Sequence, residues 1–131
     1  METQIVTRDE VVKPLRPVLT LGESVSEIEA FQNKILRPIL KFQNELLIAA
    51  AKHYCHKQNK AFNALKVTAQ KLFLKQAAKQ DQELRSLMIN LVVALFTIDE
   101  FRQYVENRPE YNKRIVQMAT ERVLSQIESL I

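Results

Sequence analysis

Glycine is nearly absent from this sequence, and its absence restricts the fold. The 131-residue chain contains a single glycine, Gly22, and no tryptophan. Hairpin turns need residues at positive φ, which glycine supplies at the lowest cost. A β or α/β fold without glycine after position 22 is therefore not expected, and glycine-rich phosphate loops are excluded for the same reason. We predict an all-α protein.

Cysteine and long apolar runs are scarce as well. The lone Cys55 has no partner for an intrachain disulfide, and no apolar signal-peptide segment follows Met1. Both features predict a cytoplasmic protein. The longest apolar run, residues 87–96, is interrupted by Asn90. It reaches about half of the roughly 20 residues that span a bilayer, so no membrane segment is predicted.

Acidic residues are missing from the middle of the chain. Residues 46–80 contain no acid and no arginine, and they hold seven lysines: Lys52, Lys57, Lys60, Lys66, Lys71, Lys75 and Lys79. A lysine face over residues 52–79 suits nucleic-acid phosphates, but base-edge reading relies on arginine. The aromatic residues Phe62 and Phe73 fall on the apolar side of the helix. We interpret the face as solvated surface, with weak nonspecific nucleic-acid binding as an alternative.

Residues 1–23 differ in composition from the rest of the chain, since they hold Pro14, Pro17 and Gly22. Proline and glycine both disfavour a helix interior, so we predict an extended arm with room for one short helical turn. Residues 24–131 are predicted to form a single helical-bundle domain. Five apolar side chains of the arm are expected to pack onto it: Val11, Val12, Leu15, Val18 and Leu19.

The first long helix is predicted to begin at Ser26, which forms a capping-box spacing with Glu29; Ser24 with Glu27 is an alternative start. Apolar residues then recur at spacings of three and four, which is typical of one helix face. They are Ile28, Phe31, Ile35, Ile39, Phe42, Leu46, Ala49 or Ala50, and Tyr54. Pro38 removes a backbone donor within this pattern. Because the pattern continues in phase, we predict a kink at Pro38.

A short duplication lies within this helix. The triplet Phe31-Gln32-Asn33 recurs eleven residues later as Phe42-Gln43-Asn44. Eleven residues are close to three helical turns. Both triplets are therefore predicted to face the same way.

Three more long helices and one short helix are predicted. The second covers residues 57–79, and the third starts at Asp81. Thr97 and Glu100 have capping-box spacing and start the short helix. Pro109 suits the first position of the last helix, which continues to about Leu130. The result is a bundle of four long helices and one short one.

His53 and His56 share one helix face and are the candidate metal ligands. The chain holds no other histidine, so a carboxylate such as Glu45 would have to complete the site, and the flanking lysines repel cations. Cys55 as a nucleophile would need an aligned histidine, whereas adjacent helical residues diverge. We interpret this segment as a solvated helix end, and we predict no cofactor and no catalytic residue.

The best small-molecule candidate is a polar set around two Arg-Pro pairs. Arginine and tyrosine near a helix N-terminus suit a small anion. The candidate ligand-binding residues are Arg37, Tyr104, Arg108, Tyr111, Asn112 and Arg114. The alternative is that these residues hydrogen-bond a corner between helices.

Several apolar residues lie off the main helix faces, namely Leu36, Leu40, Leu47, Val116 and Leu124. A bundle helix needs about three apolar positions per heptad, so this surplus indicates a second buried face. A homodimer would provide one, and a monomer wrapped by residues 1–23 is the alternative.

Two segments resemble a family of small bacterial proteins of unknown function. They contain Phe31-Gln32-Asn33, Leu36-Arg37-Pro38-Ile39-Leu40-Lys41-Phe42-Gln43-Asn44-Glu45-Leu46, Leu95-Phe96-Thr97-Ile98-Asp99-Glu100-Phe101, Tyr104, Asn112-Lys113-Arg114, Glu121-Arg122 and Ser125-Gln126. Members sometimes carry a glyoxalase label, which implies a metalloenzyme with His and Glu ligands, and no such motif is present here. The resemblance marks Arg37, Tyr104, Asn112 and Arg114 for mutagenesis.

The absence of catalytic motifs and the apolar surplus together predict a non-enzymatic helical protein that self-associates or docks a partner. Binding of a small anionic ligand, or an enzyme acting on one, is the alternative.

Overall fold

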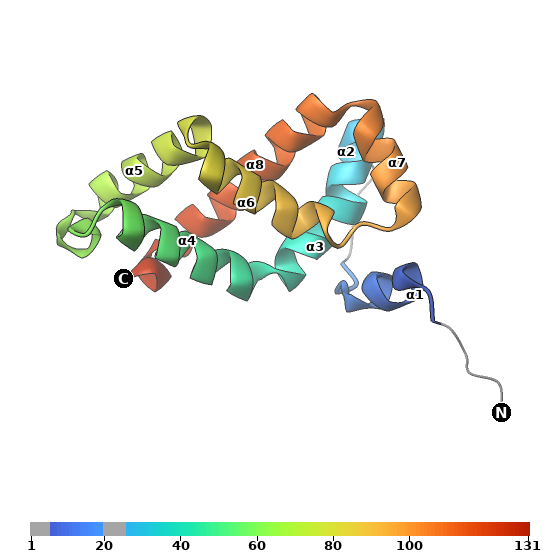
Figure 1. Cartoon of the computed structure of the whole chain (residues 1–131), viewed down its shortest axis with the longest axis horizontal. Coiled ribbons are helices and arrows are strands. Elements are labelled where there is room, and N and C mark those ends of the chain that lie inside the picture. The colour runs from blue at the N-terminus through green and yellow to red at the C-terminus, as the bar shows by residue number, and fades with distance from the viewer. Residues whose placement is uncertain (1–5, 20–25) are drawn as a thin grey trace.

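The structure is a computed structural model that describes residues 6–19 and 26–131, and every regular element in these residues is a helix (Figure 1). In chain order the elements are α1 (Arg8–Val12), η1 (Lys13–Leu15), α2 (Glu27–Phe31), η2 (Gln32–Leu36), α3 (Arg37–Phe42), α4 (Asn44–Gln58), η3 (Phe62–Ala64), α5 (Val67–Gln80), α6 (Gln82–Val93), α7 (Ile98–Glu106), α8 (Arg108–Leu124) and η4 (Ile127–Leu130). No described residue has a positive φ, in line with the scarcity of glycine. The predicted all-α class is confirmed.

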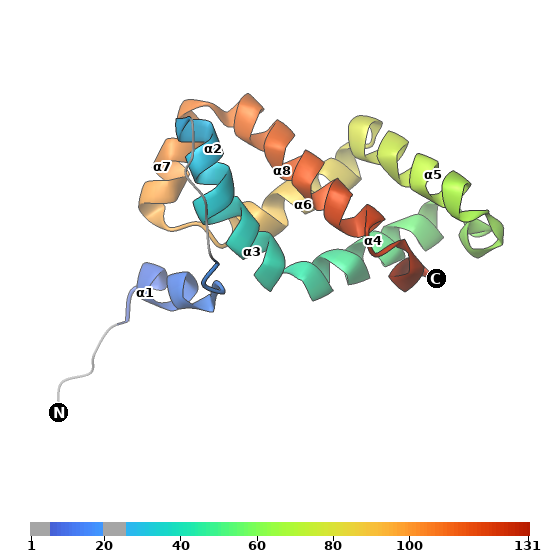
Figure 2. The same cartoon turned by 180° about the vertical axis from the view of Figure 1, so that it is seen from behind.

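Helix α8 crosses the molecule and packs on α4, α5 and α6 (Figures 1 and 2). Helices α2, α3 and α7 lie at one end, and α5 lies at the other end with the C-terminus. The core between them contains the fully buried side chains of Leu47, Leu74, Leu84, Met88, Val92, Ile115, Ala119 and Val123. Burial of each large apolar side chain contributes about 1.5–3 kcal/mol. In the described residues, no helix has the length and apolar character needed to cross a membrane.

Three predicted helix starts are confirmed by side-chain caps. The Ser26 hydroxyl accepts from the Glu29 backbone N–H at 3.1 Å, and Asp81 Oδ1 accepts from the Glu83 N–H at 2.9 Å. Thr97 and Glu100 form a complete capping box at the start of α7. Such caps satisfy backbone donors that have no partner within the helix.

The predicted first helix is divided into α2, η2, α3 and α4. The π-helical turn η2 lies directly before Pro38. Proline has no N–H to donate and clashes with the preceding turn, and a π turn accommodates one such irregularity inside a helix. The helical path breaks later, at Gln43 (φ −84°, ψ 3°), where α3 and α4 change direction (Figure 1).

The π turn also shifts the buried face by one residue. After Phe31, the next fully buried side chain is Leu36, whereas Ile35 is only half-buried. Phe42 is 44% exposed, while Phe31 is 2% exposed. The prediction that both triplets face the same way is therefore wrong. The π turn η2 takes up one residue more than an α-helical turn, and the helix direction changes at Gln43, so eleven residues no longer bring the second triplet back to the same face.

The surplus apolar residues are covered within the single chain. Leu36, Leu40, Leu47 and Val116 are buried, and Leu124 is half-buried. Three of these five belong to the face that the π turn shifted. The premise behind the predicted homodimer surface thus does not hold for these residues, and the exposed apolar side chains are different ones.

Two other helix boundaries differ from the predictions. The predicted helix over residues 57–79 is interrupted, since α4 ends at Gln58 and α5 begins at Val67. Asn59 Oδ1 accepts from the Ala61 N–H at 3.0 Å, a local side-chain bond that competes with helix formation. Helix α8 ends at Leu124, before the short turn η4.

The described part of the N-terminal arm is more helical than predicted. Helix α1 and η1 fill residues 8–15, because Thr7 caps α1 and Pro14 lies in the first turn of η1. Of the five arm side chains expected to pack on the body, only Val12 is buried, and Leu19 is half-buried. The other three are exposed: Val11, Leu15 and Val18. Gly22 and Ser24 lie outside the described residues.

Candidate functional site

Four predicted ligand residues meet at the corner between α7 and α8. The Tyr104 hydroxyl donates to Asn112 Oδ1, and Gln103 Nε2 donates to the Tyr111 hydroxyl at 3.2 Å. The Arg108 guanidinium lies 5.9 Å from the centre of the Tyr104 ring, within cation–π distance. The hydroxyls of the buried Tyr104 and Tyr111 thus have hydrogen-bond partners within the corner, as buried polar groups must, whereas Arg108 is exposed.

The remaining two predicted ligand residues lie elsewhere. Arg114 Nη1 donates to Gln32 Oε1 at 2.8 Å and so ties α8 to η2. The exposed Arg37 makes no hydrogen bond or ion pair with its side chain to the described residues. It lines a polar groove of about 480 Å³ together with Arg122. The structure therefore divides the predicted anion site between the corner at Arg108 and the groove at Arg37.

Polar side chains of the two motif segments, residues 31–46 and 95–126, join helices. Gln43 Nε2 donates to the Leu91 carbonyl at 2.8 Å. The Asn44 and Gln126 amides exchange two hydrogen bonds, at 2.9 and 2.7 Å. Arg122 Nη1 donates to Asn44 Oδ1 at 3.3 Å. These residues therefore have a structural task within the chain.

The histidine pair forms no metal centre in the described residues, where no three His, Cys, Asp or Glu side chains converge as ligands. His53 is exposed. His56 Nε2 lies 2.6 Å from the Leu130 carbonyl oxygen, and since a carbonyl only accepts, this nitrogen donates. The His56 ring also packs edge-on against Phe62. His56 thus holds η4 against α4.

Cys55 is fully buried, and this burial raises the pKa of its thiol to about 11. Because the thiolate is the reactive form, we expect iodoacetamide at pH 8 to leave Cys55 unmodified in the folded protein. Intact-mass measurement after incubation checks this, and the same reaction in concentrated urea should go to completion. Rapid modification without urea would contradict the burial.

A hydrogen bond between Tyr54 and Asp81 connects α4 to the start of α6. The Tyr54 hydroxyl donates to Asp81 Oδ2 at 2.5 Å. Burial and this hydrogen bond raise the pKa of Tyr54. The bond from Tyr54 and the backbone N–H groups of Leu84 and Glu83 lower the pKa of Asp81. The Asp81 carboxylate therefore has a structural role, since it accepts from Tyr54 and caps α6.

The lysine-rich stretch offers no aromatic stacking surface. Phe62 is fully buried and Phe73 is half-buried, so neither ring lies among the lysines as in single-strand nucleic-acid sites. Lys57 pairs with Glu83 at 3.3 Å in an exposed ion pair. This arrangement favours the interpretation of residues 52–79 as a solvated face.

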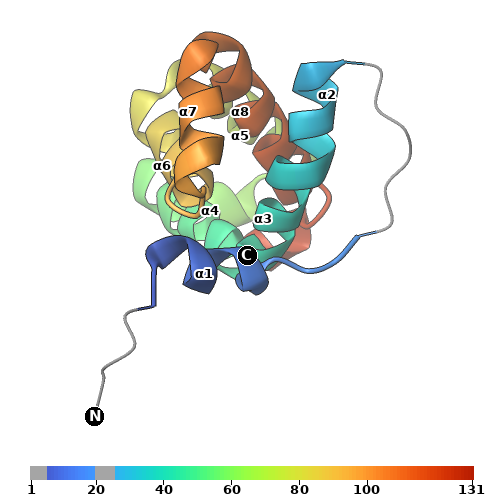
Figure 3. The same cartoon turned by 90° about the vertical axis from the view of Figure 1, so that its right-hand side faces the viewer.

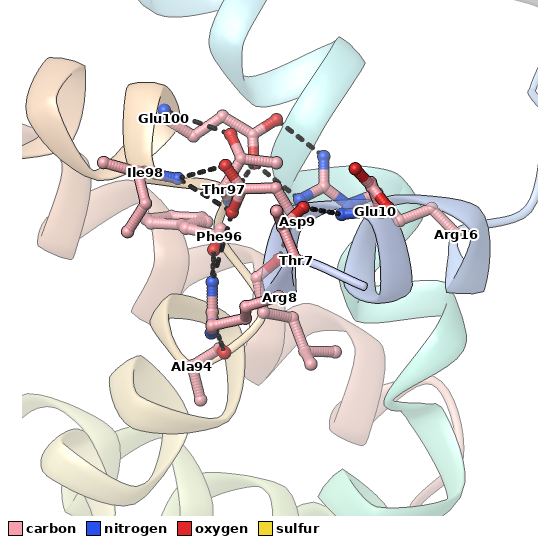
Figure 4. A network of polar contacts seen from close by, with 11 residues as sticks. Thr7, Arg8, Asp9, Glu10, Arg16, Ala94, Phe96, Thr97, Ile98 and Glu100 are labelled. Carbon is pink, nitrogen blue, oxygen red and sulfur yellow. Dashed lines mark hydrogen bonds and ion pairs between the residues drawn. The ribbon is translucent and has the colours of Figure 1, made fainter. Parts of the chain in front are cut away.

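The N-terminal segment is held by polar contacts against the loop between α6 and α7, residues 94–97, and the start of α7 (Figure 4). Arg8 donates to the carbonyls of Ala94 and Phe96 at the end of α6. Asp9 accepts from the Ile98 backbone N–H at 3.2 Å, at the start of α7. Figure 3 shows α1 beside this end of α7.

Arg16 and Glu100 form the centre of this junction. The Arg16 guanidinium donates to both Glu100 oxygens, at 2.6 and 2.5 Å, and to the Leu95 carbonyl at 2.8 Å. Their side chains are 8% and 13% exposed. Burial raises the pKa of Glu100, but the hydrogen bonds from Arg16 and Thr97 outweigh it and hold the pKa below 4.5.

Sequence reasoning missed this junction. The prediction was that apolar side chains hold the arm on the body, whereas Arg8, Asp9 and Arg16 make the specific contacts. The charged residues of the arm were the available signal. Apart from the Glu100 carboxylate, their targets are backbone carbonyls and N–H groups near helix ends, which have no signature in the sequence.

Helix α7 exposes an apolar stripe, defined as Ile98, Phe101 and Val105. These side chains are 49%, 45% and 46% exposed, and their spacing of three and four places them on one helix face. An apolar helix face normally packs on the core. In α7 the buried Tyr104 occupies the inward side, which leaves the stripe at the surface.

Comparison of the chain with protein-family models, curated proteins and solved structures finds no match. The resemblance of the two motif segments stays a prediction.

Proposed function

We propose that this chain is a non-enzymatic helical docking protein that binds a partner through the α7 stripe. The supporting observation is that the three large apolar side chains Ile98, Phe101 and Val105 share one exposed face. Exposed apolar side chains that gather on one face, rather than scatter singly, mark interaction surfaces.

The charge around the stripe favours a basic partner. Although the chain has a net charge of +4, α7 contains the acids Asp99, Glu100 and Glu106 and a single base, Arg102. Glu100 is paired with Arg16 and Asp99 with Arg102, whereas the exposed Glu106 makes no ion pair with the described residues. We therefore propose that the partner is an amphipathic helix whose apolar face is flanked by lysine or arginine. Complementary charge orients such pairs and accelerates association.

A labelled synthetic helical peptide provides the test. It carries leucines at positions i, i+3 and i+7 with flanking lysines, and the comparison peptide carries flanking glutamates. We expect fluorescence anisotropy to detect binding of the lysine peptide, and Phe101→Ser to weaken it by at least about tenfold, as for an interface hot spot.

Leu72→Ser on α5 is the matched control, because Leu72 is 55% exposed and lies outside the stripe. It should leave peptide binding unchanged. Equal loss in both variants, or equal binding of both peptides, would count against the proposal. Sedimentation of the unmodified chain tests the other occupant: a dimer that Phe101→Ser dissociates would assign the stripe to a second copy.

A further inference from the structure

A second surface with different chemistry lies on the other helices. A groove of about 400 Å³ lies between the C-terminal half of α5, the start of α6 and residues 113–124 of α8. Small-molecule sites typically measure roughly 300–1,000 Å³ and are largely apolar. This groove is independent of the α7 stripe.

The floor of the groove is apolar. Ala78, Val116 and Leu124 line it. Thr120 also lines it, but its hydroxyl donates to the Val116 carbonyl at 2.6 Å and is therefore satisfied within α8. Ala78 and Val116 are small side chains at the place where α5 approaches α8, which leaves the space unfilled.

The rim of the groove is basic. Four cationic side chains line it with a single acid, Glu121: they are Lys75, Lys79, Arg85 and Lys113. Arg85 Nη1 donates to the Ala78 carbonyl at 3.0 Å, which holds the guanidinium at the groove edge. The three lysines make no ion pair with the described residues. The positive charge around the groove is thus largely unneutralised.

We propose that this groove binds a small amphipathic anion, an aliphatic chain that ends in a carboxylate or phosphate group. In this complex the aliphatic part of the ligand covers Val116 and Leu124. Its anionic group contacts Lys79, Arg85 and Lys113. A neutral apolar molecule would not use the basic rim. An inorganic anion would meet only solvated cations, whose individual attraction is weak, and would leave the floor exposed to water.

Methyl NMR of the whole chain tests the site and the ligand class together. The probes are octanoate and octyl phosphate, with 1-octanol and inorganic phosphate as comparisons, each below its aggregation concentration. We expect octanoate and octyl phosphate to shift the methyl signals of Val116, Thr120 and Leu124 saturably. The stronger of the two identifies the preferred anionic group. Uncharged 1-octanol should bind about fivefold or more weakly, and inorganic phosphate should leave these methyl signals unchanged.

Charge variants separate the groove from general basicity. The double variant Lys79→Gln/Lys113→Gln should weaken octanoate binding about fivefold to tenfold, since each removes one partly exposed attraction. Lys66→Gln/Lys71→Gln removes the same amount of charge from positions outside the groove and should have little effect. Gln117→Trp places a large ring at an exposed lining position and should block binding without disturbing the core.

The proposal is overturned by any of three results. These are the absence of saturable shifts at the groove methyl groups, equal affinity for octanoate and 1-octanol, and equal weakening by both lysine pairs. Shifts confined to Ile98 and Val105 would likewise reject the groove, and they would assign the ligand to the α7 stripe instead.

Discussion

We expect Arg16→Met to lower the free energy of unfolding by about 3 kcal/mol, because the substitution removes one partner of a buried ion pair. Glu100, whose side chain is only 13% exposed, then loses its cation, and the Leu95 carbonyl loses its donor. The lower end of the usual range is expected because Arg16 Nε already lacks an acceptor among the described residues. Urea unfolding followed by circular dichroism measures the change.

The matched control is Arg102→Ala, which breaks the Arg102–Asp99 pair of the same helix. That pair is 73% and 91% exposed, so the change should stay below about 0.5 kcal/mol. Hydrogen exchange adds a local readout, since only Arg16→Met should raise exchange at the start of α7. Equal destabilisation by both substitutions would contradict the expectation that the buried Arg16–Glu100 pair stabilises the fold more than the exposed Arg102–Asp99 pair.

The same variant changes the response to acid. The pKa of Glu100 in the folded protein is lowered below its ordinary value of 4.5, despite burial, by Arg16 and Thr97. A group with a lowered folded pKa stabilises the protein above its unfolded pKa, and this contribution is lost as the pH falls through the folded pKa. Arg16→Met should therefore flatten the decline of stability below pH 4.5. An unchanged difference between the two proteins across this range would contradict the linkage.

Phe31→Ala is expected to cost about 3–5 kcal/mol, the usual effect of deleting a buried aromatic side chain. The Phe31 ring packs against Phe96, with 5.5 Å between ring centres, and against Tyr111, at 4.5 Å. Phe96 in turn contacts Tyr104. This cluster joins α2 to the α6–α7 loop, α7 and α8, so its loss should loosen that end of the molecule. Thermal unfolding with calorimetry measures the effect.

The chain supplies its own control in Phe42→Ala. Both phenylalanines begin the same Phe-Gln-Asn triplet, but Phe42 is 44% exposed and Phe31 is 2% exposed. Phe42→Ala should therefore cost less than about 1 kcal/mol. Similar costs at both positions would mean that the two triplets face the core equally and that the π turn does not shift the helix face.

The helix starts at Ser26, Asp81 and Thr97 show which structural features can be predicted from this sequence. Their caps are local, because each side chain bonds a backbone N–H within the next three residues. The all-α class was legible for a similar reason, since glycine scarcity and apolar periodicity act residue by residue. The Tyr104–Asn112 corner is one of the two alternatives that the sequence leaves open, and its two residues lie eight positions apart on the consecutive helices α7 and α8.

Tertiary structure decided the rest. The π turn at Gln32–Leu36 precedes Pro38 and shifts the buried face by one residue. In the sequence this shift is visible only as the apolar residues Leu36, Leu40 and Leu47, which lie off the main helix face and were interpreted as a second surface. The contact of Arg16 with Glu100 and the groove between α5 and α8 both bring together residues far apart in the chain. The separation of Arg37 from Arg108 likewise depends on how the helices are arranged in space. Periodicity indicates which face of a helix is apolar, but it carries no information on which helix that face meets.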